Sequence, residues 1–174
     1  MATDAGEVVA WLDDREMLAW RGFIETVHDL LRALEGDLAA DALTLGDYQV
    51  LVYLSEAIGP MRMSDLAALL QLTPSGLTRR LDGLVGTGDV ERVPDERDGR
   101  VMKARLTQAG RHRLATVAPH HVASVRARFL APMADADIDA VGRAFMAMRG
   151  ALPGDPPARL LRLAASAADA DQVV

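Results

Sequence analysis

The stretch from Met63 to Thr107 constrains the fold of this chain more than any other part of it. Thr73 can cap a helix whose first position is Pro74, a position where the missing N–H of proline has no intrahelical partner to lose. The spacing i, i+4, i+7 gives that helix one apolar face, formed by Leu77, Leu81 and Leu84. A shorter helix, which we expect to be capped by Ser64, precedes it. Two short helices joined by three or four residues are typical of a helix-turn-helix.

A charged hairpin is expected directly after the second helix. The segments 90–93 and 101–106 are rich enough in alternating or β-branched residues to form two strands. Between them lies the turn-rich, charged segment 94–100. A helix-turn-helix followed by such a ribbon is a winged helix, so the predicted fold is mainly α-helical with a small β-hairpin wing.

On these residues the sequence resembles the MarR family of bacterial transcription regulators. The resemblance covers roughly residues 15–150. It is carried by the wing motif Asp95-x-Arg97-Asp98-x-Arg100, the helix motif Ser75-x-x-Thr78-Arg79, and the helix start Leu106-Thr107-x-x-Gly110. The wing spacing together with the preceding helix is fairly specific, whereas the Asp-x-Arg-Asp fragment alone would be weak. The resemblance implies a homodimeric regulator, with repression as the expected activity, that binds a pseudopalindromic site on double-stranded DNA.

The resemblance also implies which side chains touch DNA. Arg97 would enter the minor groove, where a narrow groove concentrates negative potential and attracts arginine. Arg79 matches the family's position on the second helix, and arginine can bind guanine bidentately, while serine and threonine hydroxyls suit phosphates or bases. The candidate DNA contacts are Ser64, Thr73, Ser75, Thr78, Arg79, Arg97 and Arg100, and the candidates for bracing the wing are Asp95 and Asp98. Arg80 falls where many relatives carry an apolar residue, and no role is assigned to it. The alternative is a set of charges that only keeps the surface soluble.

The net charge of −6 is opposite in sign to that of a typical DNA-binding protein, but the charge is unevenly distributed. Residues 1–60 carry twelve acidic and three basic side chains, whereas residues 73–113 carry six acidic and nine basic ones. The basic surface therefore coincides with the predicted winged helix. The chain has no cysteine, which excludes disulfides, thiolate metal sites and a cysteine redox switch. It has no membrane-length apolar run and no signal-like start, so we expect a cytoplasmic protein.

Apolar seams with heptad spacing lie near both ends of the chain. The first follows steps of three and four through Met17, Trp20, Ile24, Val27, Leu31, Leu34 and Leu38, and the second through Ile138, Val141, Phe145, Met148 and Leu152. Either seam could be an ordinary core helix, but little else is available to bury them, which favours packing against a second copy. The expected organisation is a loose segment 1–14, dimerisation helices in 15–43 and 107–152, a DNA-binding region 44–106, and a short C-terminal helix and tail in 153–174. Pro119 is expected to kink or split the helix that begins after Thr107. Asp135 is expected to cap the helix that follows, and the short C-terminal helix is expected from 159 to 168.

Three residues are candidates for an effector site. In one branch of the resembled family, a urate-responsive one, a tryptophan, an aspartate and an arginine bind the ligand. Trp20 and Arg92 match two of these positions, but Gln49 holds the place of the aspartate, which argues against urate. A small aromatic or phenolic anion remains the expected ligand, although Trp20 as a plain core residue is an equal alternative.

Two other kinds of function receive little support from the sequence. No Gly-x-Ser-x-Gly, phosphate-loop or paired-carboxylate motif is present, so we expect no enzyme and no cofactor. His112, His120 and His121 fall on one predicted helical region, but their spacing does not place them around one metal ion. The principal alternative to a DNA-binding regulator is a winged helix that serves as a protein-interaction module.

Overall fold

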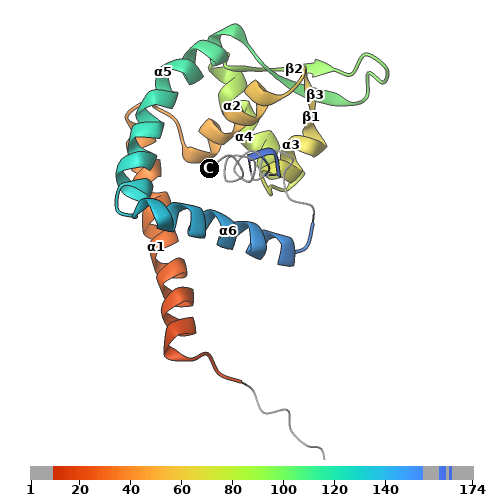
Figure 1. Cartoon of the computed structure of the whole chain (residues 1–174). Coiled ribbons are helices and arrows are strands. Elements are labelled where there is room, and N and C mark those ends of the chain that lie inside the picture. Colours follow the sequence, from red (N-terminus) through yellow and green to blue (C-terminus); the bar gives the residue numbers. More distant parts are fainter. Residues whose placement is uncertain (1–9, 155–160, 164, 166–174) are drawn as a thin grey trace, which may run out of the picture.

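The computed structural model describes residues 10–154, 161–163 and 165, and has the expected winged-helix architecture (Figure 1). Its α-helices are α1 (Asp14–Ala39), α2 (Leu45–Glu56), α3 (Met63–Leu69), α4 (Pro74–Gly86), α5 (Gln108–Val125) and α6 (Asp135–Ala151). A π-helix, η1 (Arg126–Leu130), continues α5, and the strands are β1 (Met61–Arg62), β2 (Val90–Pro94) and β3 (Met102–Leu106). The strands form an antiparallel sheet in the order β1-β3-β2. The prediction of a mainly helical chain with a small wing is therefore confirmed.

The hydrophobic core lies around α2, which contacts α1, α4, α5 and β3. Val50 and Leu51 of α2 are fully buried. They meet the apolar face of α4, where Leu77, Leu81 and Leu84 are buried as their spacing predicts, and the inner face of the sheet at Val90, Ala104 and Leu106. The helix α4 thus has one side fixed by the core, and its other side faces outward.

Only the C-terminal part of the α1 seam is buried within the chain. The helix begins with a capping box in which Asp13 and Glu16 each accept a hydrogen bond from the other residue's backbone N–H. Leu34 and Leu38 are buried, but Trp20, Ile24 and Leu31 are exposed. The N-terminal half of α1 projects away from the winged helix (Figure 1), which explains why its apolar residues lack cover.

Pro119 does not split α5, contrary to one of the two expectations for it. The helix continues through Pro119 to Val125, and the departure from α geometry comes later, in η1. Pro119 and Ala115, whose carbonyl loses its usual N–H partner, both lie on an exposed part of the helix. Water can satisfy that carbonyl, so the proline is tolerated there.

Two expected helix caps are wrong. The helix α3 begins at Met63 with Arg62 as its N-cap residue, because pairing of β1 with β3 holds Arg62 in an extended conformation. Ser64 lies inside the first turn, where its hydroxyl donates to Asp65. Ala134, not Asp135, is the N-cap residue of α6, and Asp135 lies in the first turn. Of the short C-terminal helix expected from 159 to 168, residues 161–163 and 165 are helical, and the others lie outside the described residues.

Candidate nucleic-acid interface

The exposed side of α4 carries hydroxyl groups and one free arginine. Thr73 caps the helix by accepting a hydrogen bond from the backbone N–H of Gly76 at 3.2 Å, and its Oγ1 lies 3.3 Å from Oγ of Ser75. Thr78 is exposed, and its hydroxyl donates to the carbonyl of Pro74. Arg79 is exposed and makes no ion pair with any residue that the structure describes. Ser75, Thr78 and Arg79 therefore lie on one accessible face, as the sequence predicts.

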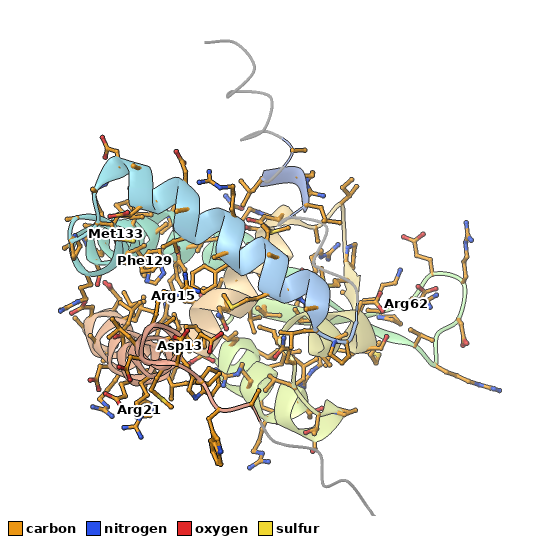
Figure 2. The ribbon with its side chains drawn as sticks, turned by 60° about the horizontal axis from the view of Figure 1, so that its bottom comes forward. Asp13, Arg15, Arg21, Arg62, Phe129 and Met133 are labelled. Atoms are coloured by element: carbon orange, nitrogen blue, oxygen red, sulfur yellow. The ribbon has the colours of Figure 1, made fainter. Side chains whose placement is uncertain are left out.

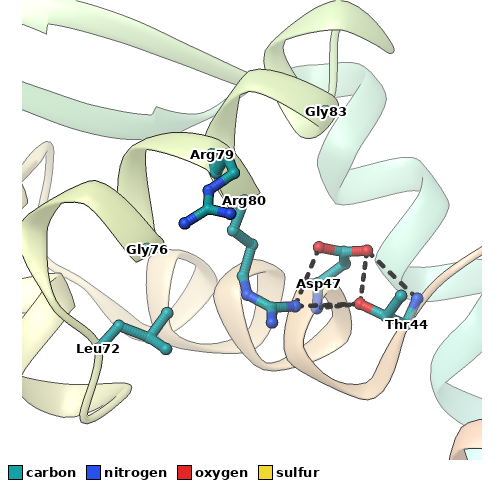
Figure 3. Close-up of a pocket in the computed structure, with 7 residues that line it drawn as sticks. All are labelled: Thr44, Asp47, Leu72, Gly76, Arg79, Arg80 and Gly83. Carbon is teal, nitrogen blue, oxygen red and sulfur yellow. Dashed lines mark hydrogen bonds and ion pairs between the residues drawn. The ribbon is translucent and has the colours of Figure 1, made fainter.

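The adjacent Arg80 is oriented differently. Its guanidinium turns toward the N-terminal turn of α2, where it forms an ion pair with Asp47 at 3.3 Å (Figure 3). A shallow hollow at this point is lined by Thr44, Asp47, Leu72, Gly76, Arg79, Arg80 and Gly83. The sequence pattern alone did not separate the two neighbouring arginines, because their difference depends on a residue 33 positions away.

The wing is a hairpin that projects from the body of the molecule (Figures 1 and 2). Asp95 organises its tip. One carboxylate oxygen accepts the backbone N–H groups of Arg97 at 2.8 Å and Asp98 at 3.2 Å, and the other lies 2.5 Å from Nζ of Lys103. The Lys103 ammonium and these two N–H donors hold the pKa of Asp95 at about 2, so the carboxylate is charged at neutral pH.

Asp98 continues the same arrangement by accepting the backbone N–H of Arg100 at 3.0 Å. Both aspartates thus bind backbone rather than the neighbouring arginine side chains. Arg97 and Arg100 are exposed, and the structure gives neither an ion-pair partner among its described residues. A turn stabilised by carboxylates that presents two free guanidinium groups is suited to contact an anionic surface.

Arg92 joins the base of the wing to α4. Its Nη2 donates to Oδ1 of Asp82 at 2.8 Å and to the carbonyl of Thr78 at 3.1 Å. The other two effector candidates do not lie beside it within one chain. Trp20 belongs to the half of α1 that projects away from the winged helix, and Gln49 is exposed on α2.

The sequence motifs do not indicate Arg62, although this residue lies near the wing. It is exposed at the junction of β1 and α3, and Figure 2 shows it at the base of the hairpin. Its Cα is paired in the sheet with that of Lys103. A strand of two residues leaves no periodic pattern, so the sequence could not place Arg62 beside the wing.

Two histidines of α5, His120 and His121, contact different residues. His120 lies with Nδ1 3.3 Å from Asp41, and the ring of His121 packs on that of Tyr48 with the centroids 4.3 Å apart. Burial lowers the pKa of His121. No group of three metal-ligating side chains occurs in the described part of the chain. No described helix is both long and apolar enough to cross a membrane.

Comparison with known proteins agrees with this geometry. Residues 43–101 match the model of the MarR family. AbsC, a MarR family transcriptional regulator from Streptomyces coelicolor, is 38% identical with a TM-score of 0.79, and the match covers 84% of this chain and 100% of AbsC. Sco3205 from the same organism, solved in complex with DNA, is 29% identical with a TM-score of 0.79 over 86% of this chain and 94% of its own.

A more distant structure is that of CouR from Rhodococcus jostii RHA1 bound to p-coumaroyl-CoA. It is 23% identical with a TM-score of 0.63, over 83% of this chain and 96% of CouR, and so supports the fold alone. No curated protein matches the chain. The match to AbsC extends over the whole of that protein and agrees with the winged helix and its exposed hydroxyl and arginine groups. The chain therefore belongs to the MarR family of DNA-binding transcriptional regulators.

Proposed function

We propose that the protein is a homodimeric repressor that acts in the cytoplasm and binds a pseudopalindromic operator. The observation that carries this proposal is the exposed face of α4, where Ser75, Thr78 and Arg79 stand opposite a fully buried apolar face. A helix fixed in this way can enter a major groove without losing its own packing, so α4 is the proposed recognition helix. Residues 44–106 would form the DNA-binding region, and residues 15–43 and 107–152 the dimerisation helices. Segments 1–14 and 153–174 would lie outside both.

Each candidate contact has a distinct role in this proposal. Arg79 reads a base edge, while Ser64, Thr73, Ser75 and Thr78 place hydroxyl groups at the groove margins. The hydroxyls of Ser64 and Thr78 would exchange their present acceptors, Asp65 and the Pro74 carbonyl, for phosphate oxygens. Arg97 enters the minor groove, and Arg100 makes a second DNA contact from the wing tip. Asp95 and Asp98 keep the tip in shape. Support for this division comes from exposure of the arginines and engagement of the aspartates with backbone N–H groups.

The dimer is supported by apolar surface that one chain leaves exposed. Trp20 is 56% exposed and Leu31 is 47% exposed on α1, and no residue of α6 is buried within the described part of the chain. The ring centroids of Phe23 on α1 and Phe145 on α6 lie 6.2 Å apart, so the two helices contribute to one apolar patch. A contiguous apolar surface of this kind is typical of a protein interface, and a second copy offers the same helices in return.

Repression is the proposed direction of control because a dimer that covers two successive grooves obstructs polymerase when its site overlaps a promoter. The effector would be a small aromatic or phenolic anion, and p-coumaroyl-CoA, the ligand in the CouR structure, carries a phenolic ring. Arg92 supports this proposal because its present partner is a carboxylate, Asp82. A ligand carboxylate that takes the place of Asp82 would loosen the wing from α4, so ligand and DNA would oppose each other by one coupling free energy. Trp20 and Gln49 are the proposed neighbours of that ligand.

The test of DNA recognition starts from a pool of randomised duplexes, from which the wild-type protein selects its preferred site. We expect a two-fold-related sequence with half-site centres about 10–10.5 bp apart. Enrichment of no sequence would contradict the proposed function. For the effector, p-coumarate is titrated against the selected complex, and release should be lost in Arg92→Ala. Release at unchanged concentration from that variant would remove Arg92 from the effector site.

A further inference from the structure

The N-terminal turn of α2 is bound directly to the recognition helix through Arg80. Its Nη1 donates to Oγ1 of Thr44 at 3.1 Å and to Oδ1 of Asp47 at 3.3 Å (Figure 3). The Arg80 and Asp47 side chains are 30% and 23% exposed, so the pair is shielded more than an ordinary surface ion pair. The same two residues, the N-cap Thr44 and Asp47, also form the capping box of α2. Arg80 therefore attaches α4 to a rigid part of α2.

Gly46 leaves the space that the Arg80 guanidinium occupies. A Cβ atom at Gly46 would lie 2.0 Å from Nη1 and 2.3 Å from Cζ of Arg80. Both distances are far below van der Waals contact, so any side chain at this position would displace the guanidinium. Gly46 lies in the first turn of α2 and not in a turn that needs a positive φ, so conformational freedom does not explain it. The close approach of the Arg80 guanidinium explains why glycine fits at this position.

The N-terminal turn of α2, to which Arg80 donates hydrogen bonds, is also bound by the helices proposed to form the dimer. Glu35 of α1 accepts the backbone N–H of Leu45 at 2.6 Å. Arg113 of α5 donates to the carbonyls of Asp41 at 3.2 Å and Ala42 at 2.8 Å. The segment between α1 and α2 is thus held by α1 and α5 on one side and by α4 on the other. It forms a continuous polar connection between the dimerisation helices and the recognition helix.

We propose that Arg80 is a positioning residue of the DNA-binding site that fixes the angle of α4 relative to α1 and α5 and does not itself contact DNA. This inference rests on the proposed function, because it assigns the spacing of two recognition helices in a dimer. The apolar face of α4 holds the helix against the core, but leucine contacts are non-directional and tolerate a small roll or slide. Hydrogen bonds are directional, so the Nη1 group of Arg80, which donates to the Thr44 hydroxyl and to the Asp47 carboxylate, adds the missing direction.

Gly46→Ala tests the connection without changing any charge. The new methyl group displaces Arg80, while alanine is a better helix former than glycine, so α2 should not be destabilised. We expect specific DNA affinity to fall about tenfold, which corresponds to a coupling of about 1.4 kcal/mol, at an unchanged or higher midpoint of thermal unfolding. The matched control is Gly36→Ala on α1, where a Cβ would meet nothing within 4 Å. Wild-type affinity in Gly46→Ala would overturn the proposal.

For Asp47→Asn, bulk electrostatics and the positioning role of Arg80 predict changes in DNA affinity of opposite sign. Removing a negative charge from a protein with a net charge of −6 should strengthen binding to DNA if bulk electrostatics dominates. The positioning role predicts weaker specific binding, because Arg80 loses its ionic partner. Asp139→Asn, an exposed change of the same charge on α6, is the control. Tighter or equal binding by Asp47→Asn, in a variant that unfolds at the wild-type urea concentration, contradicts the proposal.

The salt dependence of Arg80→Ala separates positioning from contact. Loss of a phosphate contact lowers the slope of log K against log salt by about 0.9, whereas loss of a positioning residue weakens binding and leaves the slope unchanged. A lowered slope would make Arg80 a DNA contact and overturn the inference. If the wild-type protein selects no DNA sequence, the proposed function fails by itself. The connection is then tested by the urea stabilities of Arg80→Ala, Asp47→Asn and the double variant, and additive effects would overturn it.

Discussion

Neighbouring residues of the same type have different partners in this molecule, and that difference decides their roles. Arg79 and Arg80 are adjacent on α4, but only Arg80 is paired with Asp47. In the wing, Asp95 and Asp98 bind backbone N–H groups, so the arginines beside them are left free. The charge of a residue in the sequence is therefore a poor guide to the charge it presents at the surface.

Arg79 lies on the exposed side of α4. Its exposed guanidinium is expected to read a base, so Arg79→Ala should weaken binding to the selected site by roughly 1–3 kcal/mol and relax preference at one base position. The measurement is affinity for the selected duplex and for its single-base variants. The control is Arg143→Ala, an exposed arginine on α6. An equal loss of affinity on every duplex would make Arg79 a phosphate anchor.

Arg97 and Arg100 are exposed at the wing tip. Arg97→Ala should weaken operator binding and lower the salt slope by about one unit, since one cation near the phosphates is lost. Asp98→Ala should also weaken binding, although it removes a negative charge, because Asp98 no longer accepts the N–H of Arg100. Affinity titrations of both variants at several salt concentrations provide the comparison. Tighter binding by a folded Asp98→Ala would show that Asp98 does not brace the wing.

At the scale of elements, the wing has a pH dependence that follows from Asp95. The pKa of its carboxyl is about 2 in the folded chain, against an ordinary value of 3.8. A depressed pKa stabilises the fold above the unfolded value, and this contribution is lost as pH falls through the window from about 4 to about 2. The thermal midpoints of wild type and Asp95→Asn should therefore differ at neutral pH and converge only in that window. Convergence already between about pH 7 and 5 would contradict this assignment.

The helices and the wing could be predicted from sequence because their signals are local. Thr73 with Pro74 starts α4, and the leucine spacing assigns its buried face, as observed. The strand β1 and the true start of α3 could not be predicted, because pairing of Met61 and Arg62 with β3 involves residues about forty positions away. The same limitation hid the connections of Arg80 and Arg92, which depend on tertiary contacts.

The three effector candidates follow from a position-by-position likeness to the family, but they do not lie together within one chain. Their places in the sequence indicate Trp20, Gln49 and Arg92 as candidates, but the N-terminal half of α1, which contains Trp20, projects away from the winged helix. Arg92 instead binds Asp82 and the Thr78 carbonyl. An effector site that includes all three residues stays a prediction, and it would require an arrangement beyond that of a single chain.

At the scale of the whole molecule, the exposed seams predict a dimer. Leu31 is 47% exposed in one chain, so a charge there would change the stability of a monomer by no more than about 0.5 kcal/mol. In a dimer that buries it, Leu31→Glu leaves an unpaired charge in the interface and costs several kcal/mol or more. Light scattering should therefore give a dimer for the wild type and a monomer or unfolded chain for Leu31→Glu. Ile58→Glu, a change at a fully exposed position, is the control. A wild-type monomer that binds DNA normally would contradict the dimer.

DNA recognition by the proposed dimer is tested most directly by measuring how the wild-type protein binds its selected duplex as salt and half-site spacing are varied together. Two recognition helices in successive major grooves predict a steep fall of affinity with salt, with a slope of about −0.9 for each phosphate contacted. They also predict strong loss of affinity when about five base pairs, half a helical turn, are inserted between the half-sites, because one helix then faces the wrong side of the duplex. A weak salt dependence, with equal affinity for the inserted and the selected duplex, would contradict DNA recognition by this winged helix and favour a protein-interaction module.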